Sequence, residues 1–165
     1  MNKQTEACEA AKTLFEDHGD EIYRYVRFAL GNCNDTEDIV QDIFLKALCS
    51  WSKFEHRSTS RTWLWSITRN HLKDVIRKKA REKNHLLIGT ERLPDVAVHD
   101  PTIHLELEDS LRLLTLPQRQ VFTLRVIMDR TNIEAAQILG WTPLRVRVTL
   151  HRALKKLEGL LINDC

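Results

Sequence analysis

The segment RTWLWSITRNHLKDVIR, residues 61–77, carries the helical pattern that decides the fold. On a wheel of 100° per residue its apolar side chains fill one half: Leu64, Trp65, Ile67, Leu72, Val75 and Ile76. Its polar side chains fill the other half, with Trp63 at the margin: Ser66, Arg69, Asn70, Lys73 and Arg77. One face is therefore expected in a core, while the cations and the amide on the other suit nucleic acid phosphates and base edges.

The loop before this helix is short and polar. Its residues can offer hydrogen bonds to a base turned out of its stack: Glu55, His56, Arg57, Ser58, Thr59 and Ser60. Trp63 is suited equally to stacking on that base and to packing in a core, whereas Trp65 is expected in the core. Loop and helix together predict a surface for unpaired nucleic acid, with an ordinary solvated charged face as the alternative.

Helical periodicity extends to both sides of this segment, and alternating strand patterns do not. Helices are expected at residues 8–17, 20–31, 36–51, 61–82, 104–114, 118–128, 132–139 and 143–161. Between them the pattern fails at Gly89, Pro94 and Pro101. The sequence thus predicts an all-α protein of two small helical domains: a four-helix domain at residues 1–83, a flexible linker at 84–103 and a smaller domain at 104–165.

Residues that start and stop helices support these boundaries. Gly31 and Gly140 suit helix C termini. Thr131, with Glu134 three residues on, forms a capping box. Residue 142 is a threonine followed by proline, which is typical of an N-cap. The capping box at Thr131, the glycine at 140 and the threonine–proline pair at 142–143 together predict a helix-turn-helix near the carboxy terminus.

The second helix of this motif has a basic outer side that is expected to face DNA. Its residues are Arg145, Arg147, Val148, Thr149, His151, Arg152 and Lys155. Arg145 is placed to pair with guanine and Val148 to touch a thymine methyl group. The cations at 147, 152 and 155 suit phosphates. A helical hairpin for protein contacts is the alternative.

A third surface lies on the helix expected at residues 36–51. Beside its apolar core stripe, four residues fall together at spacings of three, four and seven: Asp38, Gln41, Asp42 and Leu45. These four residues form either an ordinary solvated face or an acidic docking surface for a basic protein. In a docking surface the acids would attract the basic partner, and the leucine would be buried against it.

The charge distribution agrees with these surfaces. The chain has 25 basic and 23 acidic side chains and a net charge of +2. By segment, residues 1–55 carry −5, residues 56–92 carry +7, and residues 93–165 are neutral with their positive charge gathered on the final helix. Two separated basic patches indicate two contacts with a polyanion.

The sequence lacks the patterns of enzymes, metal sites and membrane proteins. It has no glycine-rich phosphate loop, G-x-S-x-G or H-E-x-x-H, and its four cysteines lack metal-ligand spacing. We therefore expect no catalytic residue, no cofactor and no metal. No apolar stretch approaches the roughly 20 residues of a membrane span. The amino terminus has no export signal pattern, so a cytoplasmic protein with reduced thiols is expected.

Three motifs in one order resemble those of the extracytoplasmic-function (ECF) sigma factors of the sigma-70 family. The segment TEDIVQDIFLKAL, residues 36–48, resembles the family's helix for core polymerase. Residues 61–77 resemble its −10 promoter helix. The segments LPQRQVF, residues 116–122, and EAAQILG, residues 134–140, resemble its −35 domain. The resemblance runs through nearly the whole chain.

The resemblance implies an RNA polymerase sigma factor, without catalysis of its own, that recognises −35 and −10 promoter elements and promotes promoter melting. The acidic face would contact the clamp helices of the large polymerase subunit. The loop at 55–60 would capture an unpaired −10 base, and the polar face of 61–77 would contact the melting strand. A separate anti-sigma factor is expected, and no membrane insertion. Residues 145–149, RVRVT, depart from the common family pattern, so the −35 sequence does not carry over.

Two other functions stay open at this point. An autonomous helix-turn-helix regulator would bind duplex DNA as a dimer, but the sequence lacks a long dimerisation helix and has an acidic docking face. A helical adaptor that binds only proteins would leave both basic patches unexplained. Co-purification with core RNA polymerase separates a sigma factor from both.

Overall fold

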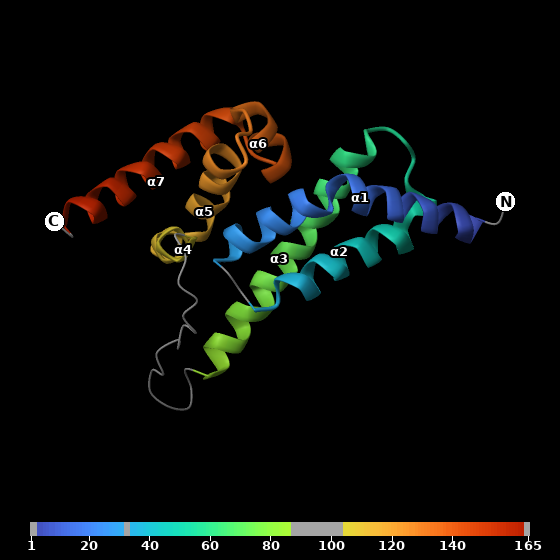
Figure 1. The fold of residues 1–165 in the computed structure, drawn as a ribbon, viewed down its shortest axis with the longest axis horizontal. Coiled ribbons are helices and arrows are strands. Elements are labelled where there is room, and N and C mark those ends of the chain that lie inside the picture. Colours follow the sequence, from blue (N-terminus) through green and yellow to red (C-terminus); the bar gives the residue numbers. More distant parts are fainter. Residues whose placement is uncertain (1–2, 32–33, 87–103, 164–165) are drawn as a thin grey trace.

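The computed structural model describes residues 3–31, 34–86 and 104–163, and within these ranges all regular structure is helical (Figure 1). The amino-terminal half contains α1 (Lys3–Leu30), α2 (Thr36–Ser50), the short 3-10 helix η1 (Trp51–Lys53) and α3 (Ser60–Leu86). The carboxy-terminal half contains α4 (His104–Arg112), α5 (Leu116–Phe122), the π-helical turn η2 (Thr123–Ile127), α6 (Asn132–Leu139) and α7 (Pro143–Asn163). The predicted all-α class is confirmed.

Helix α1 differs from the sequence prediction, because it runs without a break through the two helices expected at 8–17 and 20–31. The break was expected around Gly19, which is buried, and a Cβ there would stand 3.5 Å from the ring of Phe15. A glycine inside a helix costs roughly 0.5–1 kcal/mol. Burial of Leu14, Ile22 and Val26 on both sides of it offsets this cost. The described amino-terminal half therefore has three α-helices and a 3-10 turn rather than four helices.

The helix ends predicted from capping residues are confirmed, at Gly31 in the amino-terminal half and at the helix-turn-helix in the carboxy-terminal half. Gly31 and Gly140 have φ of 73° and 68°, the left-handed region that glycine enters without strain. The hydroxyl of Thr131 accepts a hydrogen bond from the backbone N–H of Glu134 (3.2 Å), whose carboxylate accepts one from the backbone N–H of Thr131 (2.8 Å). Thr142 Oγ1 accepts from the backbone N–H of residue 145 (3.3 Å). The turn between α6 and α7 is therefore fixed on both sides.

The main core lies where α1, α2 and α3 meet. Ile22, Ile43 and Leu64 are fully buried there, one from each helix. Trp65 is also buried and packs edge-on against Tyr25, with ring centroids 5.1 Å apart, which confirms its predicted place in the core. The apolar half of the α3 wheel is therefore the half that packs inward.

The two halves of the chain share this core. Buried residues of α6, among them Ala135 and Ile138, belong to the same apolar cluster as the α1–α3 residues. α1 packs against α5, and α3 packs against α6 (Figure 1). Most of the predicted linker, residues 87–103, lies outside the described residues, and Asn84 to Leu86 belong to α3. The halves are thus in direct contact.

Candidate nucleic-acid interface

The acidic face of α2 is exposed as one surface. Ile39, Ile43 and Ala47 are buried on the core side of α2. The predicted docking residues lie on the outer side, all exposed: Asp38, Gln41, Asp42 and Leu45. The Leu45 side chain is the apolar member and has 56% of its surface exposed. An exposed leucine among acids is suited to a basic partner with an apolar pocket.

A buried histidine lies beneath this face. His71 of α3 is 8% exposed, and its Nδ1 lies 2.7 Å from Lys46 Nζ of α2, so the neutral ring accepts from the ammonium group. Its Nε2 lies 3.6 Å from an Asp42 carboxylate oxygen. Burial, and then the charge of Lys46, lower the pKa of His71, against the opposing effect of Asp42. His71 is therefore held neutral at the base of the acidic face.

His71→Asn should flatten the dependence of stability on pH below about 6.5, the pKa of an unperturbed histidine. Because the folded pKa is lowered, the unfolded chain binds more protons in this range, and the free energy of unfolding falls as the pH falls. The slope from one such group is at most about 1.4 kcal/mol per pH unit. Urea unfolding from pH 7 to 5 measures it, with exposed His151→Asn as control. Equal slopes in the original chain and His71→Asn would contradict the assignment.

The loop before α3 rests on an aromatic cluster. Phe54 is buried and stacks on Trp63, with centroids 4.8 Å apart and the rings 29° from parallel. Trp51 meets Trp63 edge-on at 5.6 Å, and His56, whose φ is 53°, lies 4.4 Å from the Phe54 ring. Trp63 is half-buried, so it packs in this cluster and also keeps surface at the rim. The sequence reasoning missed Trp51 and Phe54 as supports, although four aromatic or histidine residues within 13 positions were a signal.

Most of the predicted loop residues lie on the surface. Five are exposed: Glu55, His56, Arg57, Ser58 and Thr59. Glu55 and Arg57 pair with each other at 2.8 Å, and both stay largely exposed. Thr59 Oγ1 accepts from the backbone N–H of Thr62 (3.2 Å), which fixes the start of α3, while Ser60 is half-buried. The loop therefore presents donors and acceptors on an ordered base.

The polar face of α3 divides in two. Asn70, Lys73 and Arg77 are exposed and form the open part of the predicted DNA face. Ser66 is half-buried and its hydroxyl donates to the carbonyl of residue 63 (2.6 Å). Arg69 is also half-buried, because its guanidinium lies against the backbone of Gly140, 2.7 Å from where a Cβ would stand. The carboxy-terminal half thus covers one of the predicted DNA contacts.

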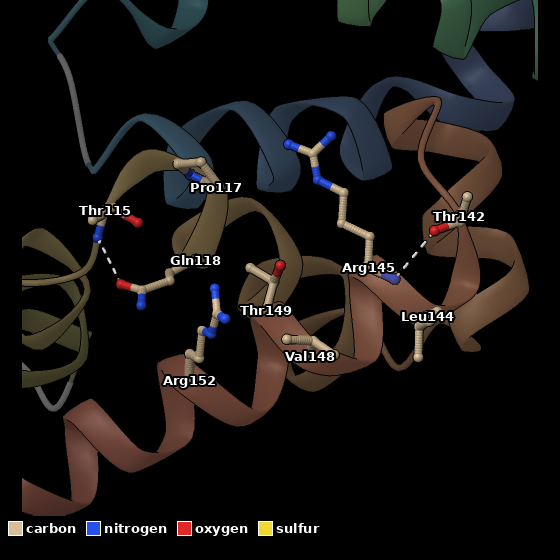
Figure 2. A pocket seen from close by; sticks show the side chains of 9 residues that line it. All are labelled: Thr115, Pro117, Gln118, Thr142, Leu144, Arg145, Val148, Thr149 and Arg152. Atoms are coloured by element: carbon tan, nitrogen blue, oxygen red, sulfur yellow. Dashed lines mark hydrogen bonds between the residues drawn. The ribbon is translucent and has the colours of Figure 1, made fainter.

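A surface hollow lies along the predicted recognition helix (Figure 2). Its lining comes from the start of α5, the turn before α7 and the first half of α7: Thr115, Pro117, Gln118, Thr142, Leu144, Arg145, Val148, Thr149 and Arg152. The guanidinium of Arg145 stacks on the ring of Trp141, 3.9 Å from its centroid. Three other predicted DNA residues, Arg147, His151 and Lys155, are exposed on α7 but do not line the hollow.

The start of α5 was missed as part of this surface. The side-chain carbonyl of Gln118 accepts from the backbone N–H of Thr115 (3.0 Å), so the first turn of α5 is capped beside the recognition helix. The T-x-x-Q spacing at 115–118 was a readable signal for the cap. It was no signal for contact with α7, which depends on packing between the two helices.

Two family models match these two halves of the chain. The model of sigma-70 region 2 matches residues 14–82, which include most of α1, all of α2 and most of α3. The model of sigma-70 region 4 matches residues 104–157, from the start of α4 into α7. The ECF RNA polymerase sigma factor SigX of Bacillus subtilis is 31% identical, over 91% of this chain and 82% of SigX. The chain belongs to the ECF RNA polymerase sigma factors. This family consists of transcription initiation factors, not catalysts.

Solved structures of sigma factors resemble this ECF sigma factor over most of its length. RpoE of Bartonella quintana, in complex with the anti-sigma factor NepR, matches with a TM-score of 0.73 at 23% identity, over 93% of this chain and 98% of RpoE. CnrH, in complex with the cytosolic domain of CnrY, matches with a TM-score of 0.68 at 26% identity, over 98% of each chain. The ECF sigma factor therefore shares their fold. Within its described ranges, no helix combines the length and apolar character that crossing a membrane requires.

Proposed function

We propose that this ECF sigma factor docks on core RNA polymerase through the acidic face of α2 and binds promoter DNA with the loop at 55–60, α3 and α7. The observation that carries the proposal is the separation of three surfaces: Asp38, Asp42 and Leu45 are exposed together on α2, while exposed cations of the predicted DNA surfaces lie on α3 and on α7. One protein contact and two DNA contacts are what a promoter-recognition subunit needs. The clamp helices of the large polymerase subunit are the proposed partner of α2.

The two DNA surfaces divide the promoter between them. The first half of α7 enters the major groove at −35, where Arg145 and Val148 meet base edges and Arg152 meets phosphates. The loop at 55–60 and Trp63 hold unpaired −10 bases, and stacking of this kind contributes about 1–3 kcal/mol per base. Binding of the single strand drives melting, so the chain needs neither a cofactor nor catalysis of its own. The proposed domains are residues 1–83 and 104–165, and the first three residues of the proposed linker at 84–103 continue α3.

A separate anti-sigma factor is the proposed regulator, because both solved structures with the same fold hold a sigma factor bound to such a partner or to a cytosolic domain. The proposed location is the cytoplasm, where core polymerase acts. An autonomous duplex-binding regulator is the competing function, and it leaves the α2 face without a role.

Pull-down with core polymerase, followed by run-off transcription on promoter templates, tests the proposal. The chain should bind core polymerase and direct initiation at specific promoters without an added nucleotide-hydrolysing factor. Binding to duplex DNA without any binding to core polymerase would favour the autonomous regulator instead.

A further inference from the structure

Glu21 of α1 holds an arginine from each half of the chain. Its side chain is 15% exposed. Both carboxylate oxygens accept from Arg61 of α3, at 2.7 Å from Nη2 and 3.4 Å from Nε. The same carboxylate accepts from Arg130, which precedes α6 and lies 109 positions away in the chain. His18 completes the surroundings, with its Nδ1 3.7 Å from Glu21. One carboxylate therefore bridges two guanidinium groups across the contact between the halves.

The two arginines stand at places where DNA phosphates are expected. Arg61 is in the first turn of α3, two residues before Trp63 at the proposed −10 surface. Arg130 lies just before Thr131, the N-cap of α6, and α6 is the first helix of the helix-turn-helix, the helix that crosses the DNA backbone in such motifs. Guanidinium groups bind carboxylates and phosphates with the same two-pronged geometry. The Glu21 carboxylate therefore has the charge and the acceptor spacing of a phosphate.

Other contacts close the same interface. Arg27 of α1 pairs with buried Glu108 of α4 at 2.7 Å, and Arg24 donates to the carbonyl of Ile127 (3.2 Å). A small hollow where α3 faces α6 is lined by residues of both helices, including Arg61 and Glu134. In this arrangement α6 covers the start of α3 and the guanidinium of Arg69. The guanidinium donors of Arg61 and Arg130 that are paired with Glu21 are not available to a phosphate in this arrangement.

We propose that Glu21 is an internal phosphate mimic: it holds Arg61 and Arg130 in the free chain, and promoter DNA takes its place on both arginines. This inference rests on the proposed function and adds two phosphate-binding residues and one competing residue to it. It also makes the closed arrangement of the halves a competitor of DNA binding, since one set of arginines serves both.

Glu21→Gln tests the competition, because it removes the charge and keeps the shape. The matched control is Glu16→Gln on the same helix, which removes the same charge from an exposed side chain whose partner is Lys12 at 3.8 Å. Fluorescence anisotropy with labelled promoter DNA, duplex at −35 and unpaired at −10, should show about fivefold tighter binding or more for the free Glu21→Gln chain. Glu16→Gln should bind as the original chain does. Circular dichroism melting establishes that both variants are folded.

Arg61→Gln and Arg130→Gln separate a phosphate mimic from a purely structural contact. Both also break the closed arrangement, but they should weaken promoter binding by the holoenzyme. Each should reduce the slope of log affinity against log salt by about 0.9 for a duplex contact or about 0.7 for a single-strand contact. Measured on the free chain as well, the mimic therefore predicts opposite effects of the glutamate and arginine substitutions on DNA affinity, whereas a structural contact predicts the same sign for all three.

Two results would overturn the inference: DNA binding by Glu21→Gln equal to that of Glu16→Gln, or unchanged affinity and salt slope in either arginine variant. Failure of the proposed function is distinguishable, because the original chain itself would then give no promoter-specific transcription with core polymerase. A wrong inference about Glu21 leaves that activity intact.

Discussion

Leu45→Lys should abolish capture of core RNA polymerase by this sigma factor while leaving its helical fold intact. Leu45 is 56% exposed on α2, so the fold loses little packing. In a complex, full burial of a leucine side chain contributes about 1.5–3 kcal/mol. The substitution removes this burial free energy and places a cation against a basic partner. We therefore expect the affinity for core polymerase to fall at least about a hundredfold.

Leu113→Lys is the matched control, since Leu113 is 52% exposed and lies outside the acidic face. Both variants should give the same circular dichroism spectrum and the same urea midpoint. Titration of labelled core polymerase then compares their dissociation constants. If Leu45→Lys binds core polymerase as tightly as Leu113→Lys, the acidic face is an ordinary solvated surface and polymerase docks elsewhere.

The helices of this chain were largely predictable because their signals are local. The apolar half of α3, the capping box at Thr131 and the left-handed Gly140 each depend on residues within one or two turns. Gly19 shows the limit of such signals. Glycine commonly ends a helix, but here packing of α1 on both sides carries the helix through it, and that packing involves residues far away in the chain.

The sequence predicted which side of a helix each candidate site residue lies on, but not which distant residues would contact it. The sequence placed Arg69 with Asn70 and Lys73 on one polar side of a helix, and the latter two are exposed. It contained no information that Gly140, 71 positions later, would lie against the Arg69 guanidinium. The contact between Arg130 and the Glu21 carboxylate was equally unpredictable. Hydrophobic periodicity identifies which side of a helix is buried, but it does not identify what covers the other side.

Arg145 of the recognition helix is expected to determine part of the −35 specificity, and Arg145→Ala tests this expectation. Trp141 supports the flat face of the Arg145 guanidinium at 3.9 Å, and the edge donors of a stacked guanidinium stay free for guanine O6 and N7. The capped first turn of α7 fixes the backbone below it. A pre-positioned side chain loses less entropy on binding, so Arg145 is expected to discriminate bases more than it adds general affinity.

Arg145→Ala should therefore lower discrimination at one base pair of the −35 element by about 1–3 kcal/mol, or about 5-fold to about 150-fold, and leave the other positions unchanged. Run-off transcription by the holoenzyme, on promoters with each −35 base pair changed singly, measures this. Arg147→Ala is the control, because an exposed cation outside the hollow should weaken all templates alike and reduce the salt slope by about 0.9. A uniform loss in Arg145→Ala as well would make Arg145 a phosphate contact, and base reading would then fall to Val148, Thr149 and Arg152, which line the same hollow.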